Sequence, residues 1–201
     1  MKKNRIKNFN MIIVGTGGQG LITLLQILAE AALIEGYDVK TSELHGLSQR
    51  GGSVEVHIRF GKEIYSPLIF PGKANLILGL EMQEALRAYS FANSGTTFLL
   101  NKEITPIPMA KSLPEKEILK NLNKINKNII LVPAGKICKE KLGTEVVAGI
   151  YLISLAAFLG LFLIKPASIL KAIGKVIPKK YLPINHKTFK LAKSYEEGKE
   201  K

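Results

Sequence analysis

Residues 11–36 read MIIVGTGGQGLITLLQILAEAALIEG: an apolar stretch, a glycine-rich turn, then a long run with helical spacing. The apolar stretch Met11–Val14 predicts a buried strand, and the leucines after Gly20 predict a helix that ends at Gly36. Tyr37–Ser42 has the composition of a second strand. A strand, a glycine turn and a helix in this order are typical of an α/β protein.

The rest of the chain continues this alternation. We expect strands at Asn75–Leu80, Thr96–Leu100 and Asn128–Val132, a helix at Glu81–Phe91, a second helix opened by a capping box of Ser112 and Glu115, and helices thereafter. The prediction is a doubly wound, mostly parallel sheet with a β-hairpin insertion and a helical C-terminal part. At 201 residues we expect a single domain over 1–201 with its core at about 11–197.

The hairpin is predicted from alternation. Ser53–Phe60 places valine, isoleucine and phenylalanine on one face and charged residues on the other. The turn Gly61–Lys62 then returns the chain through Glu63–Ser66. We therefore expect the hairpin to follow the loop HGLSQRGG (45–52).

The apolar run VVAGIYLISLAAFLGLFLI (146–164) reaches the length of a minimal membrane span. No second such run exists, and Gly149, Ser154 and Gly160 are small residues suited to close helix packing. We therefore predict a buried helix and no membrane span. One cysteine, Cys138, excludes an intrachain disulfide, and the N-terminus does not resemble a secretory signal, so a cytoplasmic location is expected.

The net charge of +13 is unevenly distributed. Residues 1–110 carry 11 basic and 9 acidic side chains, whereas residues 111–201 carry 18 and 7. Lys116, Lys120 and Lys124 lie on one face of a predicted amphipathic helix, which is the pattern of a solvated surface. The alternative is a basic nucleic-acid-binding module, but the lysines are not interleaved with aromatic residues, and no nucleic-acid partner is expected.

The turn GTGGQG (15–20) matches the pattern G-x-G-x-x-G, and an acidic residue, Glu43, follows the predicted second strand. In a dinucleotide fold such glycines admit a pyrophosphate, and the acid binds a ribose hydroxyl. The candidate cofactor-binding residues are therefore Gly15, Thr16, Gly17, Gly18, Gln19, Gly20 and Glu43. A free-standing NAD(P)- or FAD-dependent oxidoreductase is one hypothesis, and glycines that only allow close strand–helix packing are the alternative.

The loop HGLSQRGG combines polar side chains with flexible backbone. Arg50 is suited to bind a phosphate or carboxylate, and Gly51 and Gly52 allow close approach of a ligand or another backbone. His45, Gln49 and Arg50 are thus possible contributors to an active site, with Gly51 and Gly52 as cofactor-binding positions. The alternative is that His45 and Arg50 pair with Glu43 or loop carbonyls and only stiffen the hairpin.

GTGGQG, SELHGLSQRGGSVEVHIRFG (42–61) and YSPLI (65–69), in this order, resemble the small subunit of indolepyruvate ferredoxin oxidoreductases. More broadly the chain is similar to the gamma domain of pyruvate and 2-oxoacid ferredoxin oxidoreductases, over about Met11–Glu197. The version of the loop with His45, Gln49 and Arg50 resembles the arylpyruvate branch, and a gamma subunit for pyruvate or another 2-oxoacid is the alternative. Family members often carry an asparagine where this chain has Thr144–Glu145–Val146.

The resemblance implies oxidative decarboxylation of a 2-oxoacid with coenzyme A to acyl-CoA, CO2 and reduced ferredoxin, using thiamine diphosphate, Mg2+ and [4Fe-4S] clusters. This chain lacks a G-D-G diphosphate motif, and one cysteine cannot ligate a cluster. We therefore expect no catalytic residue, no metal site and no tightly bound cofactor on this chain, which would be inactive alone. The implied partner is a large thiamine- and iron–sulfur-binding subunit in a heterotetramer, and we expect this chain to complete its active site and help bind coenzyme A.

Overall fold

The structure, a computed structural model, describes residues 8–46, 51–106, 112–196 and 198. Its described strands are β1 (Asn8–Thr16), β2 (Asp38–His45), β3 (Ser53–Gly61), β4 (Leu76–Gly79), β5 (Thr97–Asn101) and β6 (Ile129–Val132). They form one sheet in the order β2-β3-β1-β4-β5-β6. The β1–β4, β4–β5 and β5–β6 pairs are parallel, and β3 runs antiparallel to both β1 and β2. The predicted mostly parallel α/β sheet is confirmed.

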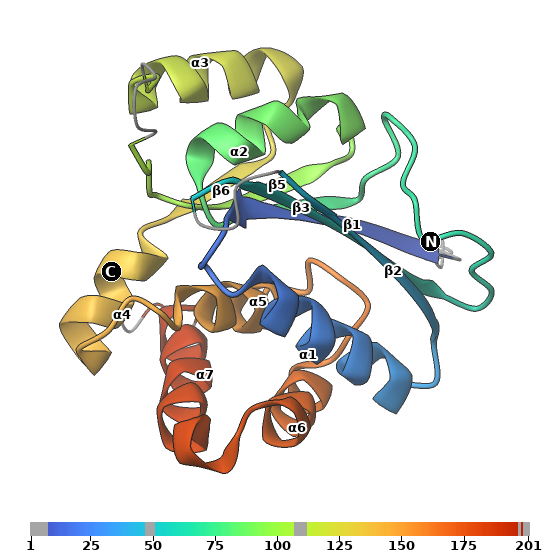
Figure 1. Cartoon of the computed structure of the whole chain (residues 1–201), viewed down its shortest axis with the longest axis vertical. Coiled ribbons are helices and arrows are strands. Elements are labelled where there is room, and N and C mark those ends of the chain that lie inside the picture. The colour runs from blue at the N-terminus through green and yellow to red at the C-terminus, as the bar shows by residue number, and fades with distance from the viewer. Residues whose placement is uncertain (1–7, 47–50, 107–111, 197, 199–201) are drawn as a thin grey trace.

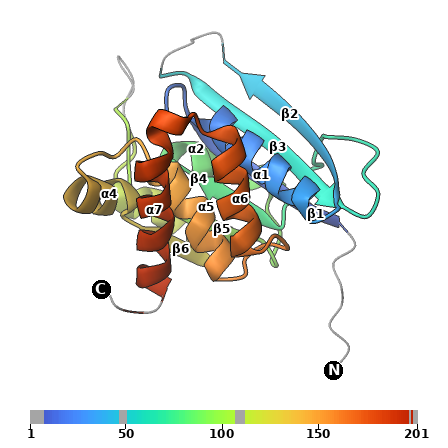
Figure 2. The ribbon, with the colours of Figure 1, turned by 90° about the horizontal axis from the view of Figure 1, so that it is seen from below.

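Helices cover both faces of this sheet. They are α1 (Leu21–Ile34), α2 (Met82–Arg87), α3 (Glu115–Ile125), α4 (Ala134–Leu142), α5 (Ala148–Phe158), α6 (Pro166–Val176) and α7 (Leu182–Glu196), with 3₁₀ turns η1 (Ala88–Phe91) and η2 (Lys179–Tyr181). Figure 1 shows α2 and α3 on one face and α1, α5, α6 and α7 on the other. The view in Figure 2 has α1, α5, α6 and α7 in front of the sheet. This is the doubly wound arrangement with a helical C-terminal part.

The middle of strand β1, Met11–Val14, is apolar because both of its faces are buried. Met11 and Ile13 belong to the larger core, which α1 and α5 complete. Ile12 and Val14 point to the opposite face, into the core under α2 and α3. Successive side chains of a strand alternate between faces, so a strand between two helical layers needs an unbroken apolar run.

The predicted place of the hairpin is wrong. The hairpin consists of β2 and β3, so HGLSQRGG lies within its connection, and Glu63–Ser66 is not a strand. The reason is that β1 and β2 already occupy both edges of β3. The chain after Gly61 instead runs as a loop whose backbone bonds to side chains: Ile64 N donates to Asp38 Oδ2 (2.8 Å), and Arg59 Nη1 donates to the carbonyl of Ser66 (2.7 Å).

The apolar run 146–164 contains a buried helix, as predicted, but the helix is shorter than the run. Helix α5 spans Ala148–Phe158 and is buried over all residues from Ala148 to Ala157. The chain then turns at Gly160, which has a φ of 64°. Within the described ranges, no helix combines the length and apolar character needed to cross a membrane.

The amphipathic lysine helix is confirmed as α3, which buries Ile118 and Leu122. Its predicted capping box is wrong, because the N-cap residue is Pro114, without a side-chain cap. The Glu115 carboxylate forms an ion pair with Lys102 (3.0 Å) instead of folding back on its own helix.

Candidate functional site

The turn between β1 and α1 is filled by one of its own side chains. Gln19 Oε1 accepts a hydrogen bond from the backbone N–H of Thr16 (2.8 Å). A Cβ atom at Gly15 would lie 2.5 Å from that oxygen, so a larger residue there would displace the Gln19 side chain. Gly20, the N-cap of α1, has a φ of 78°, which glycine adopts without strain. The N–H of Thr16 is thus already paired within the turn.

This glycine turn is hydrogen-bonded to the base of the β2–β3 connection. Gly17 N donates to the carbonyl of Gly52 (2.8 Å), and Gly51 N donates to the carbonyl of Gly17 (3.3 Å). The two unusual glycine stretches of the sequence therefore meet in space, which the sequence did not reveal. We call these three glycines the glycine junction. Gln49 and Arg50, predicted to act here, lie outside the described residues.

A second contact anchors the connection to α2. Ser53, the first residue of β3, donates its hydroxyl to Glu84 Oε2 (2.5 Å). Glu84 is 4% exposed, and its other oxygen accepts from Arg87 (2.9 Å). Residues 51–53 are therefore fixed to the glycine turn and to α2.

Glu43 and His45 lie on the edge strand β2, apart from the glycine turn. Their side chains pair with each other (3.2 Å), and the side chains of His45 and Glu43 are 52% and 35% exposed. Because β3 lies between β2 and β1, about 10 Å separates β2 from β1 in the plane of the sheet. The structure thus brings Gly51 and Gly52 to the glycine turn but leaves Glu43 away from it. The dinucleotide hypothesis needs that acid beside the turn.

A small crevice lies at the carboxyl ends of β1, β4 and β5, where α1 and α2 depart to opposite faces of the sheet. Ligands of open α/β sheets bind at such a place. The crevice has a volume of about 180 Å³, and its lining residues are Gly18, Gln19, Leu80, Asn101, Glu103, Glu145, Val146, Ala148 and Gly149. Sequence reasoning missed Asn101 and Glu103, although both follow the predicted strand Thr96–Leu100 at its carboxyl end.

Asn101 holds this crevice together. It is 2% exposed, its Nδ2 donates to Glu103 Oε2 (2.7 Å), and its Oδ1 accepts from Gly135 N (3.1 Å). Burial raises the pKa of Glu103, and the nearby Glu145 carboxylate adds to this, although the bond from Asn101 opposes it. Two carboxylates at the switch point disfavour a pyrophosphate there, which weakens the hypothesis of a free-standing dinucleotide enzyme.

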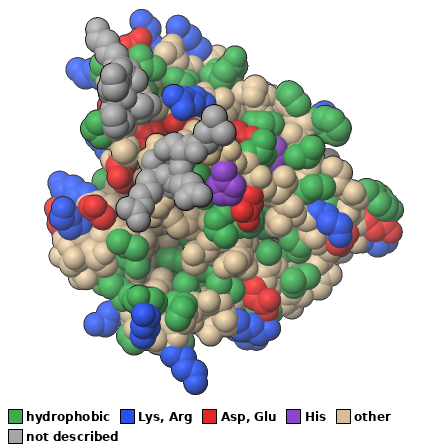
Figure 3. Space-filling view, viewed as in Figure 1, with side chains coloured by type: hydrophobic (Ala, Val, Ile, Leu, Met, Phe, Trp, Pro, Cys, Tyr) green, Lys and Arg blue, Asp and Glu red, His purple; other side chains and the backbone are tan. Residues whose placement is uncertain are grey.

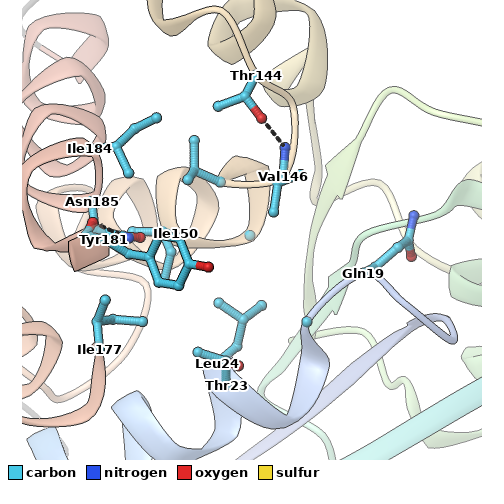
Figure 4. A pocket seen from close by; sticks show the side chains of 13 residues that line it. Gln19, Thr23, Leu24, Thr144, Val146, Ile150, Ile177, Tyr181, Ile184 and Asn185 are labelled. Carbon is cyan, nitrogen blue, oxygen red and sulfur yellow. Dashed lines mark hydrogen bonds between the residues drawn. The ribbon is translucent and has the colours of Figure 1, made fainter. Parts of the chain in front are cut away.

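A larger cavity adjoins the crevice, and Gln19, Val146 and Gly149 border both. It has a volume of about 470 Å³ and lies between the start of α1, the start of α5 and the η2–α7 segment (Figure 4). In this view the Gln19 side chain points away from the cavity, toward the glycine turn. The sequence gave no signal for this cavity, because its walls come from three distant segments.

Possible metal ligands do not gather in the part of the chain that the structure describes. Among the described residues, no group of three or more His, Cys, Asp or Glu side chains lies close enough to hold a metal ion. Cys138 is buried, and burial raises the pKa of its thiol to about 12. A thiol that resists deprotonation is a poor metal ligand.

These features define an α/β domain whose glycine turn is joined to an inserted hairpin at the edge of the sheet. The family model described as pyruvate ferredoxin/flavodoxin oxidoreductase matches residues 10–195. The chain belongs to this family.

Individual relatives agree with that assignment. The chain is 41% identical over 151 residues to indolepyruvate oxidoreductase subunit IorB of Archaeoglobus fulgidus, covering 73% of this chain and 74% of that protein. It is 32% identical over 192 residues to the subunit of the same name from Thermococcus kodakarensis, covering 92% and 95%. Among solved structures, the 2-oxoglutarate:ferredoxin oxidoreductase of Magnetococcus marinus shares the fold, with a TM-score of 0.72 and 17% identity. That likeness covers 96% of this chain and 31% of the longer one.

Proposed function

We propose that this chain is the small subunit of an indolepyruvate-type 2-oxoacid ferredoxin oxidoreductase. The observation that carries this proposal is the similarity to two IorB subunits, one of them over 92% of the chain. The complex would decarboxylate an arylpyruvate oxidatively, transfer the acyl group to coenzyme A and pass two electrons to ferredoxin. Thiamine diphosphate, Mg2+ and [4Fe-4S] clusters would reside on the large subunit. The sequence of this chain lacks a G-D-G diphosphate motif, and its described residues gather no group of three or more His, Cys, Asp or Glu side chains that could hold a metal ion.

The role of this chain is to complete the partner's active site through the β2–β3 connection. The glycine junction and the Ser53–Glu84 bond fix the base of that connection. His45, at the end of β2, lies on the same connection and is exposed. A segment with a fixed base loses less conformational entropy when it docks, so its polar residues are well suited to contact a partner.

Coenzyme A would reach this chain from the side of the hairpin connection. The opposite side of the glycine turn is the acidic crevice with Glu103 and Glu145, which repels phosphates. Arg50 is the residue on the connection best equipped to bind a phosphate through two parallel hydrogen bonds, in a bidentate manner. Gly51 and Gly52, joined to Gly17, would let the ligand approach the backbone.

The experiment is reconstitution with the large subunit, with Arg50→Ala as the test variant and Lys62→Ala as a matched control at the other end of β3. The isolated chain is expected to fold but to turn over no 2-oxoacid, and the reconstituted complex to prefer arylpyruvates over pyruvate. Arg50→Ala is expected to keep its melting temperature but to weaken assembly, or to raise the KM for coenzyme A, about tenfold or more, as loss of one charge-assisted contact implies.

Three results would contradict the proposal. They are 2-oxoacid turnover by the isolated chain, failure to form a complex with the large subunit, and an Arg50→Ala variant that melts early but assembles and reacts normally. The last result would make Arg50 a brace of the hairpin. Native mass spectrometry of the complex tests the expected heterotetramer.

A further inference from the structure

The 470 Å³ cavity beside the glycine turn opens to solvent and has the size of a ligand pocket. Ligand pockets fall in the range of about 300–1,000 Å³. Its walls come from the first turns of α1, from residues 144–150 and from residues 177–185, so three segments distant in sequence enclose one hollow (Figure 4).

The lining of this cavity is uncharged, although the chain carries a net charge of +13. None of the described residues that line it is Asp, Glu, Lys, Arg or His. Leu24, Val147 and Ile150 form one apolar wall, and Ile177 and Ile184 form the other. Because a charge in such surroundings has no partner, the part of a ligand that enters must be neutral and largely apolar.

A valine and a tyrosine border the mouth of the cavity. Val146 and Tyr181 line it with 82% and 51% of their surfaces exposed. Figure 4 shows the Tyr181 ring extending into the hollow from the α7 side. In the space-filling view of Figure 3, Lys and Arg side chains lie mainly at the periphery of this face of the molecule. One charged group does lie beside the mouth, because Lys180 Nζ is 4.6 Å from the centre of the Tyr181 ring.

One polar side chain of the lining, Asn185, determines where the polar group of a ligand would lie. Asn185 is 5% exposed, and its Nδ2 donates to the carbonyl of Tyr181 (2.8 Å). A carbonyl can only accept, so this bond fixes which side of the amide is nitrogen. The Asn185 Oδ1 atom is then an acceptor to which no described residue donates. Asn185 Oδ1 is not one of the fully buried atoms that lack a partner, so water in the cavity can reach it. A ligand that brings an N–H or O–H group would replace that water.

We propose that this cavity binds a small, uncharged, apolar molecule that carries one N–H or O–H donor, which pairs with Asn185 Oδ1. The site belongs to this chain alone and does not depend on the proposed function. It can therefore be tested without the large subunit, and its failure would leave the assignment to the oxidoreductase complex untouched.

The test is calorimetric titration of the purified chain with three probes: indole, indene and indole-5-carboxylate. Indene has the shape of indole without the N–H donor, and the carboxylate adds a charge. We expect saturable binding of indole at one site. Indene should bind about three- to tenfold more weakly, as loss of one neutral hydrogen bond implies, and the carboxylate at least about tenfold more weakly.

Two variants locate the site. Ile184→Trp should fill the cavity and abolish indole binding. Asn185→Leu should remove the preference for indole over indene. The matched control is Thr188→Val, which removes a helix-internal hydrogen bond of similar kind, from Thr188 Oγ1 to the carbonyl of Ile184 (2.9 Å), on the same helix but outside the lining. This control should bind like the wild type.

An independent measurement covers the case in which Asn185→Leu does not fold. Methyl NMR of the wild type should show indole shifting the signals of Ile150, Ile177 and Ile184 and leaving that of Ile118, under the opposite face of the sheet, in place. The proposal is overturned if indole does not bind saturably, if indene or the carboxylate binds as tightly as indole, if Ile184→Trp binds normally, or if the shifted methyl groups lie elsewhere.

Discussion

Replacing Ser53 by alanine removes the hydroxyl that anchors the β2–β3 connection to α2. The Ser53 Oγ to Glu84 Oε2 distance is 2.5 Å, and Glu84 is 4% exposed. In Ser53→Ala this carboxylate oxygen loses a partner that water cannot readily replace. A hydrogen bond to a charged, buried group contributes about 1.5–3 kcal/mol, so the free energy of unfolding should fall by that amount. For a domain of this size the melting temperature should fall by about 3–12 °C.

The assay combines urea unfolding with amide hydrogen exchange. In Ser53→Ala the amides of Gly17 and Gly51, the donors of the glycine junction, should exchange faster. The amide of Leu80 donates to the carbonyl of Val14 on the other side of β1 (2.8 Å). This amide should lose only the protection against exchange that follows from the lower stability of the whole domain. A local loss of protection would show that the serine holds the base of the connection.

Two control variants make the result specific. Ser53→Thr keeps the hydroxyl and should stay close to the wild type. Ser66→Ala removes a hydroxyl that accepts a long hydrogen bond from Leu68 N (3.3 Å) in an exposed loop, and should change stability by less than about 0.5 kcal/mol. The reasoning is refuted if Ser53→Ala is as stable as Ser66→Ala and the glycine amides exchange at the wild-type rate.

Three further predictions concern the crevice and the cores. Burial raises the pKa of Glu103 above its ordinary value of 4.5. The folded chain therefore holds the proton of the Glu103 carboxyl more tightly than the unfolded chain does. As the pH rises above 4.5, ionisation of Glu103 lowers the free energy of unfolding of the wild type. Glu103→Gln should therefore melt higher than the wild type at pH 7.5 and equally at pH 4, and parallel pH profiles would contradict this. Gly79→Ala would place a Cβ atom 2.7 Å from Ala85 Cβ, which has no flexible end to move, so urea unfolding should show a loss of about 1–3 kcal/mol. Cys138 should not react with Ellman's reagent at pH 8 until the chain is unfolded, because burial raises its pKa to about 12, and rapid labelling of the native chain would disprove this.

Much of the fold could be predicted because its signals are local. The run Met11–Val14 is apolar on both faces, and the glycine turn and leucine spacing after it define a helix within a few residues. The alternation of Ser53–Phe60 likewise identified β3. The expected pairing of β3 with Glu63–Ser66 was wrong because alternation shows which face of a strand is buried but not which strand lies beside it. Only the strand order decided that Glu63–Ser66 has no edge to join.

The sequence also carried the likeness to the oxidoreductase small subunits, since the motifs that mark it are contiguous stretches of residues. It could not show that Gly17 bonds to Gly51 and Gly52, or that Glu103 and Glu145 share a crevice. It gave no sign of the cavity around Asn185. Such pairings depend on which chain segments the sheet and its helical layers bring together. The sequence by itself therefore determined the elements and the family, whereas the tertiary structure alone decided the sites, because a hydrogen bond or a cavity wall between distant residues exists only once the packing has placed them.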